Sequence, residues 1–84
     1  MTRQAIYDRL RAIGVSVESA DAVSEALEPL PDKKVEAFLL WAMGYNNLEV
    51  AMLSGVDEIT IRRLLKKICR KCAGKCPSFW ESNE

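Results

Sequence analysis

Residues 49–67, EVAMLSGVDEITIRRLLKK, decide the fold predicted for this chain. Apolar residues recur at helical spacing on both sides of Gly55, a residue that readily adopts a left-handed turn. Asp57 follows two residues later and is a typical helix-capping residue. The stretch therefore predicts two helices that meet at a tight turn, with the second helix beginning at about Asp57.

The second of these helices, expected over residues 57–72, has an apolar side and a basic side. It is expected to end near Gly74, because Pro77 cannot continue a helix. Its expected buried residues are Ile61, Leu64, Leu65 and Ile68, and its expected exposed bases are Arg62, Arg63, Lys66, Lys67, Arg70 and Lys71.

The rest of the chain also indicates helices. Apolar residues at helical spacing, interrupted by glycine and proline, predict further helices before residue 46, and no strand-like alternation persists. Residues 37–43, AFLLWAM, are apolar nearly all round. Their helix should therefore lie between the N-terminal and C-terminal helices, with Phe38, Trp41 and Met43 in the core. We predict an all-α fold of about five short helices, an orthogonal bundle with a three-helix, helix-turn-helix core.

Eighty-four residues suffice for one modest hydrophobic core. We expect a single domain over residues 1–84, made of an N-terminal helical pair (1–30), the three-helix core (31–73) and a C-terminal tail (74–84). The longest apolar run is too short to span a bilayer, and the first residues carry no secretory signal. We therefore expect a cytoplasmic protein with no membrane partner.

The formal net charge of zero hides a strong asymmetry. Residues 1–61 hold ten acids and five bases, a net charge of −5, whereas residues 62–84 hold seven bases and two acids, a net charge of +5. Such segregation is typical of a protein with an anionic partner, although a basic run is also commonly just a solvated surface.

The spacing over residues 47–66 resembles the helix-turn-helix of bacterial and phage regulators, in particular lactose-repressor-type and phage-repressor-type motifs. That motif has a small residue at its fifth place, glycine at its ninth, and aliphatic residues at its fourth, tenth, fifteenth and eighteenth. Residues 30–46 are similar to the lead-in helix of sigma-factor region 4 and of LuxR-type regulators. The matching positions here are Ala51, Gly55, Val50, Val56, Ile61 and Leu64.

The resemblance implies a sequence-specific, DNA-binding transcription regulator that places residues 57–72 in the major groove of double-stranded DNA. Glu58 could accept a hydrogen bond from cytosine, and Ile59 could pack on a thymine methyl group. The alternative for Glu58 is simple compensation of the helix dipole. The resemblance assigns base reading to Glu58, Ile59, Arg62 and Arg63, and phosphate contact to Asn46, Asn47, Lys66 and Lys67.

One such module contacts few base pairs, so the resemblance also implies a homodimer on a pseudo-palindromic site. The expected interface consists of apolar residues of the N-terminal helices, namely Leu10, Ile13, Val23 and Leu27.

The alternative function is that of an adaptor. It would use the same three-helix scaffold to bind a protein, such as RNA polymerase or another regulator, rather than DNA. The acidic N-terminal half of the chain favours this alternative, as do the two carboxylates that begin the last helix.

Catalysis and cofactor binding find little support in the sequence. The chain has no histidine, no nucleophile motif and no glycine-rich phosphate loop, so we expect neither an enzyme nor a cofactor. Cys69, Cys72 and Cys76 form C-x2-C-x3-C, but tetrahedral zinc usually takes four ligands and no fourth cysteine or histidine exists. We therefore expect core thiols and no metal; a metal or cluster site and a redox-sensing or intermolecular disulfide are the alternatives.

Overall fold

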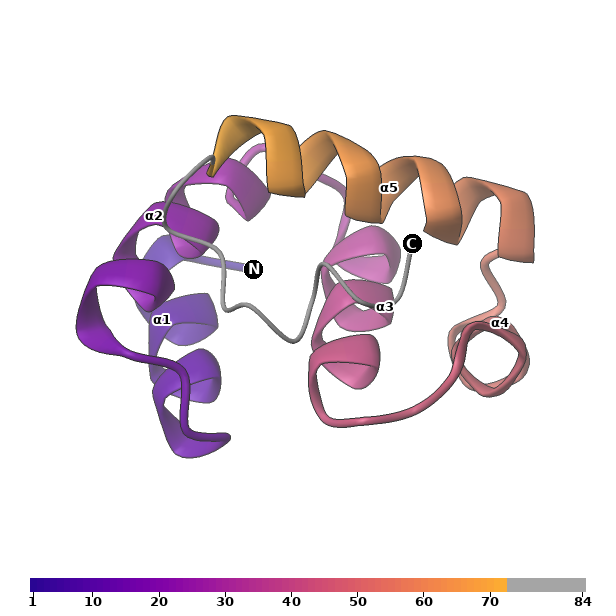
Figure 1. Ribbon diagram of the computed structural model, residues 1–84, viewed down its shortest axis with the longest axis horizontal. Coiled ribbons are helices and arrows are strands. Elements are labelled where there is room, and N and C mark those ends of the chain that lie inside the picture. The colour runs from indigo at the N-terminus through magenta and orange to yellow at the C-terminus, as the bar shows by residue number, and fades with distance from the viewer. Residues whose placement is uncertain (73–84) are drawn as a thin grey trace.

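The computed structural model describes residues 1–72, and over them the chain forms five helices and no strand (Figure 1). The all-α prediction is thus confirmed. The predicted tail, residues 74–84, lies outside the described residues. The helices are α1 (Arg3–Ala12), α2 (Val17–Leu27), α3 (Asp32–Ala42), α4 (Asn47–Ser54) and α5 (Glu58–Lys71).

Four of the helices begin at a short polar side chain that accepts a hydrogen bond from a backbone N–H three residues further on. These caps are Thr2 for α1, Ser16 for α2, Asn46 for α4 and Asp57 for α5. The helix α3 instead starts after Pro31, whose fixed φ suits a helix start. The local sequence therefore determines where each helix begins.

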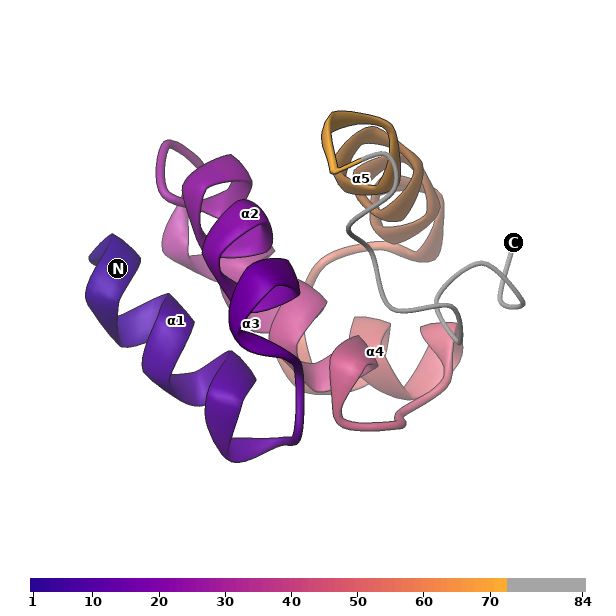
Figure 2. The ribbon, with the colours of Figure 1, turned by 60° about the vertical axis from the view of Figure 1, so that its left-hand side comes forward.

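The helix α3 is the centre of the fold. It contacts α1 on one side and α4 and α5 on the other, while α1 and α2 lie side by side and α2 also contacts α5 (Figure 2). Phe38 is fully buried, and its ring lies 5.8 Å from that of Trp41, centroid to centroid. The predicted position of α3 between the two helical pairs is therefore confirmed.

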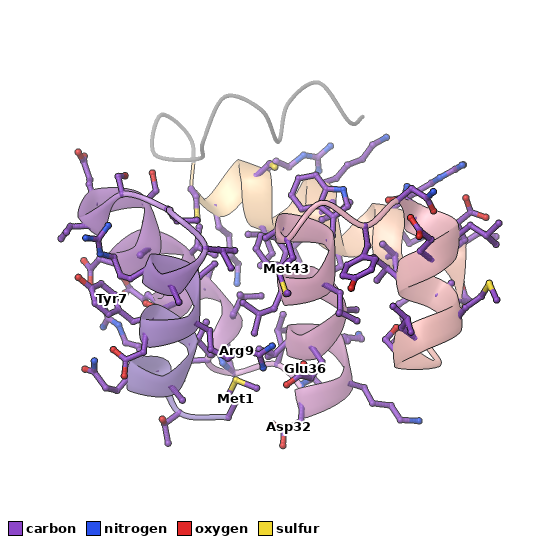
Figure 3. The ribbon with its side chains drawn as sticks, turned by 90° about the horizontal axis from the view of Figure 1, so that it is seen from below. Met1, Tyr7, Arg9, Asp32, Glu36 and Met43 are labelled. Carbon is purple, nitrogen blue, oxygen red and sulfur yellow. The ribbon has the colours of Figure 1, made fainter. Side chains whose placement is uncertain are left out.

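Met43 is not in the core, contrary to the sequence-based expectation. It is 52% exposed and lies at the end of α3, where the chain leaves the helix (Figure 3). The apolar run continues to residue 43, but the helix ends at Ala42 and the chain turns away at Gly44.

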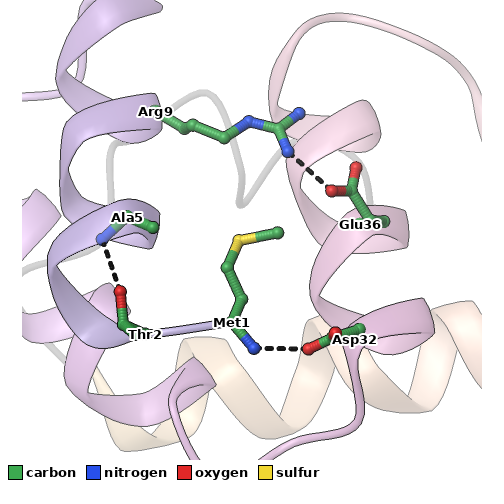
Figure 4. A network of polar contacts seen from close by, with 6 residues as sticks. All are labelled: Met1, Thr2, Ala5, Arg9, Asp32 and Glu36. Atoms are coloured by element: carbon green, nitrogen blue, oxygen red, sulfur yellow. Dashed lines mark hydrogen bonds and ion pairs between the residues drawn. The ribbon is translucent and has the colours of Figure 1, made fainter.

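Polar contacts join α1 to α3 at the surface. The Nη1 atom of Arg9 donates to Oε1 of Glu36 at 2.6 Å, and the amino group of Met1 contacts the carboxylate of Asp32 (Figure 4). The side chains of Arg9 and Glu36 are each about two-fifths exposed, so solvent weakens their attraction. These pairs orient α1 on α3, while the apolar core supplies most of the stability.

The turn between α4 and α5 has the geometry that the sequence predicts. Gly55 has φ 76° and ψ 9°, in the left-handed region, and its N–H donates to the carbonyl of Ala51 at 3.0 Å. The hydroxyl of Ser54 accepts from the N–H of Val56 at 3.2 Å, which orders the next residue. Three residues therefore connect α4 to α5, and α3 contacts both helices.

We expect the substitution Gly55→Val to lower the free energy of unfolding by about 1–3 kcal/mol. The cause is backbone strain rather than crowding, because a Cβ atom added at Gly55 would meet nothing within 4 Å. Gly55→Asn is the matched control, since asparagine tolerates the left-handed region and should cost much less. Urea unfolding of both variants measures the difference. Equal stabilities for the two variants would contradict a strained turn.

Candidate nucleic-acid interface

The helix α5 carries the basic surface of the molecule along one edge, extending over α3 from α4 to α2 (Figure 1). Its fourteen residues give it a length of about 21 Å. The predicted apolar side, Ile61, Leu64, Leu65 and Ile68, is buried. The predicted bases are all exposed, and we call them the α5 basic face: Arg62, Arg63, Lys66, Lys67, Arg70 and Lys71.

The start of α5 is held by Asp57. Its Oδ1 atom accepts from the N–H of Thr60 at 2.8 Å, and its Oδ2 atom accepts from the Thr60 hydroxyl at 3.0 Å. The hydrogen bond from the Thr60 N–H, followed by that from its hydroxyl, lowers the pKa of Asp57 below its ordinary value. Asp57 is therefore an ionised helix cap, as predicted, and its carboxylate is committed to the helix.

Glu58 and Arg62 form an ion pair on the first turns of α5. Nη2 of Arg62 donates to Oε1 of Glu58 at 3.3 Å, across one helical turn. Ile59, between them in sequence, is 64% exposed. Two of the residues assigned to base reading thus contact each other, and the pair sets an acceptor and a donor side by side on the surface.

The start of α4 faces the start of α5 across a shallow recess of about 300 Å³. Its lining includes Asn46, Asn47 and Glu58, so the structure brings together three predicted site residues that come from two helices. Trp41 and Leu48 complete the lining. The recess combines polar groups at its edge with an aromatic surface.

Glu49 closes the start of α4 through hydrogen bonds with Asn46, which sequence reasoning missed. Its N–H donates to Oδ1 of Asn46 at 2.8 Å, and its Oε1 atom accepts from the N–H of Asn46 at 3.1 Å. This reciprocal arrangement is a capping box, and the spacing N-x-x-E could have indicated it. A carboxylate beside Asn46 and Asn47 makes phosphate contact there less favourable than at Lys66 and Lys67.

Lys66 and Lys67 lie apart from the recess. They are eight and nine residues beyond Glu58, which places them about 12 Å or more along the axis of α5. Arg62 and Arg63 connect the two places, because Lys66 and Lys67 follow them by four residues, about one helical turn. Of the predicted site residues, Asn46, Asn47 and Glu58 line the recess, and Ile59 and the four bases continue along the exposed side of α5.

Three of the four residues expected to form the dimer interface are not available for it. Leu10, Val23 and Leu27 are fully buried in the core, and only Ile13 of the four is exposed. The reason is that α1 and α2 use their apolar sides to pack on each other, on α3 and on α5. The three buried residues cannot also contact a second copy.

The two described cysteines lie at the C-terminal end of α5, Cys69 in its last turn and Cys72 at its C-cap. Cys72 is buried in the core cluster and Cys69 packs against it, as predicted, whereas Cys76 lies outside the described residues. Within residues 1–72, no group of three or more cysteine or acidic side chains is placed to hold a metal ion. In that same part of the chain, no helix has both the length and the apolar character needed to cross a membrane.

Comparison of the chain with protein-family models, with curated proteins and with solved structures found no match. The helix-turn-helix resemblance therefore depends on the residues of this chain and on the geometry of α3, α4 and α5.

We expect the stability of α5 to depend on pH through Asp57. Because its pKa is lower in the folded state, folding favours the ionised carboxylate. The cap therefore contributes fully above the ordinary pKa of 3.8, and this contribution is lost as the pH falls through the lower folded pKa. Melting temperatures of the chain and of Asp57→Asn, measured from pH 7 downward, check this.

In that comparison, asparagine caps a helix about as well as aspartate but does not titrate. The melting temperature of Asp57→Asn should therefore fall less than that of the unmodified chain below pH 3.8. Parallel pH profiles for the two proteins would show that Asp57 plays no part in the acid response.

Proposed function

We propose that this chain is a small cytoplasmic DNA-binding transcription regulator that places α5 in the major groove. The observation that carries the proposal is the α5 basic face. Residues 62–72 hold six bases and no acid, whereas residues 1–61 carry a net charge of −5. All six bases are exposed on one uninterrupted helix.

The dimensions of α5 support this proposal. The major groove of B-DNA is about 12 Å wide and admits an α-helix. The outer side of α5 is exposed over its full length, so it can approach DNA without rearrangement of α3 or α4. In this proposal Ile59, Arg62 and Arg63 contact base edges, and Lys66 and Lys67 contact the phosphate backbone.

The Glu58–Arg62 pair gives the proposal a specific chemistry. An arginine guanidinium that is oriented by a carboxylate presents its remaining N–H donors in a fixed direction, and guanine O6 and N7 are acceptors for such a fork. The Glu58 carboxylate, in turn, can accept from cytosine N4. The ion pair therefore matches a G·C-containing step better than an A·T-only step.

The distribution of charge also supports one mode of approach. The acids outside α5 make the other surfaces repel a polyanion, so long-range electrostatics would turn α5 towards DNA. A single helix reads few base pairs, and we expect two copies to occupy neighbouring half-sites. Leu10, Val23 and Leu27 do not supply the contact between the copies, because they are buried.

A second candidate function is that of an adaptor that binds RNA polymerase or another regulator. It is favoured by exposed apolar side chains on α4, a helix that contains one buried residue, Val50. Duplex DNA separates the two candidates. A DNA-binding protein should bind random duplex with an affinity that falls as salt rises, whereas a pure adaptor should not shift the duplex at any salt concentration.

Arg63 and Lys67 test whether α5 reads and holds DNA in the proposed way. Arg63→Ala should cost about 1–3 kcal/mol of binding free energy on the preferred sequence and relax discrimination at one base pair. Lys67→Ala should weaken binding to all sequences alike and reduce the salt slope by about one unit. Titrations of preferred and scrambled duplexes at several salt concentrations give both quantities.

The matched control is Lys33→Ala, which removes an exposed base from the first turn of α3 rather than from α5. It should leave both the affinity and the salt slope nearly unchanged. If Arg63→Ala and Lys67→Ala behave like this control, the α5 basic face is only a solvated surface and the adaptor is the better explanation.

A further inference from the structure

The outer side of α4 exposes large apolar side chains. Leu48, Met52 and Leu53 are 60%, 77% and 61% exposed. Leu48 and Met52 are four residues apart, and so are Glu49 and Leu53, which places the four residues in two neighbouring rows on one side of the helix. We call these four residues the α4 outer face. Large exposed apolar side chains that gather on one side of a helix are candidates for an interaction site.

The charge on this surface is negative. Residues 43–58 contain three carboxylates and neither lysine nor arginine. Asp57 caps α5 and Glu58 pairs with Arg62, so both are engaged by α5. Glu49 is exposed on α4 itself, in the same two rows as the apolar side chains, and its Oε1 atom accepts from the N–H of Asn46 at the start of the helix, so its charge stays on α4. A polyanion such as DNA would be repelled here, so the α4 outer face is distinct in chemistry from the α5 basic face.

We propose that the α4 outer face binds a short amphipathic helix of another protein, one that carries lysine or arginine beside its apolar side chains. The apolar side chains of that helix would cover Leu48, Met52 and Leu53, and one of its bases would pair with Glu49. Recognition of a helix by such a surface uses apolar anchors three or four residues apart. Met52 can adapt to irregular neighbours because its side chain is unbranched and flexible.

The same charge argues against a second copy of this chain as the occupant. A two-fold contact through α4 would bring Glu49 of one copy near Glu49 of the other, and like charges oppose such a contact. A basic helix avoids this repulsion, because its lysine or arginine would pair with Glu49.

The two surfaces would let the chain hold DNA through α5 and a protein through α4 at the same time. The binding of a partner at α4 does not depend on the DNA-binding proposal, because it uses different side chains. An experiment can therefore test the two separately.

The probe is a displayed library of random peptides about 16 residues long on a helix-forming framework, selected for binding to the full-length chain. We expect the enriched peptides to be amphipathic and rich in lysine and arginine. One enriched peptide is then synthesised and titrated against the full-length chain and its variants. Enrichment only of peptides whose affinity Met52→Ser leaves unchanged, or no enrichment at all, would overturn the proposal.

Two substitutions on α4 define the contact. Met52→Ser should weaken peptide binding about tenfold, as expected when an apolar anchor is lost. Glu49→Gln should weaken it less and reduce its salt dependence, because glutamine preserves the capping box and removes only the charge. Peptide affinity that is unchanged in both variants would refute the assignment to this face.

Ile59→Ser is the matched control, since Ile59 is a similarly exposed apolar residue on α5. Ile59→Ser should leave peptide binding unchanged and weaken DNA binding. Met52→Ser should weaken peptide binding and leave DNA binding unchanged. A loss of peptide binding in Ile59→Ser equal to that in Met52→Ser would mean non-specific apolar adhesion and would overturn the proposal. Failure of the chain to bind DNA, with the peptide results intact, would refute only the DNA-binding function.

Sedimentation of the full-length chain and of Met52→Ser tests whether a second copy of this chain covers the α4 outer face instead. We expect identical sedimentation for the two proteins. A dimer that Met52→Ser dissociates would identify a second copy as the occupant and overturn the proposal.

Discussion

The burial of α3 on several sides is the constraint on which the rest of the structure depends. A helix that contacts α1, α4 and α5 must be apolar around most of its circumference, and Val35 with residues 37–42 meets that requirement. Neither helical pair has a sufficient core by itself in a chain of this size. Because α3 joins both pairs, its apolar run fixes their arrangement and leaves the opposite side of α5 to solvent.

Most of the fold could be predicted from the sequence because its signals are local. Gly55 and Asp57 indicate the turn by backbone geometry and capping, and the alternation of apolar and basic residues in α5 indicates which side is buried. The prediction that Met43 lies in the core was wrong, because an apolar run does not show at which of its residues the helix ends. The end of α3 is set by the turn at Gly44, one residue beyond Met43.

The candidate site was predictable in part. The exposure of the α5 bases follows from helical periodicity, but the recess between α4 and α5 depends on how two helices cross, which spacing does not specify. The residues expected to form a dimer interface on the N-terminal helices were misassigned for a related reason. An apolar stripe predicts burial, but it does not say whether the chain itself or a second copy covers it, and here Leu10 and Leu27 are buried within the chain's own core.

The contact between α2 and α5 gives the basic helix a third support, because α4 and α3 also pack against it. A helix fixed in this way cannot tilt without disturbing the packing of the N-terminal pair. Adjustment to a ligand must then come from the long side chains of arginine and lysine or from deformation of the ligand itself. Binding would then cost mainly side-chain conformational entropy, because the backbone of α5 already has its bound arrangement in the free protein.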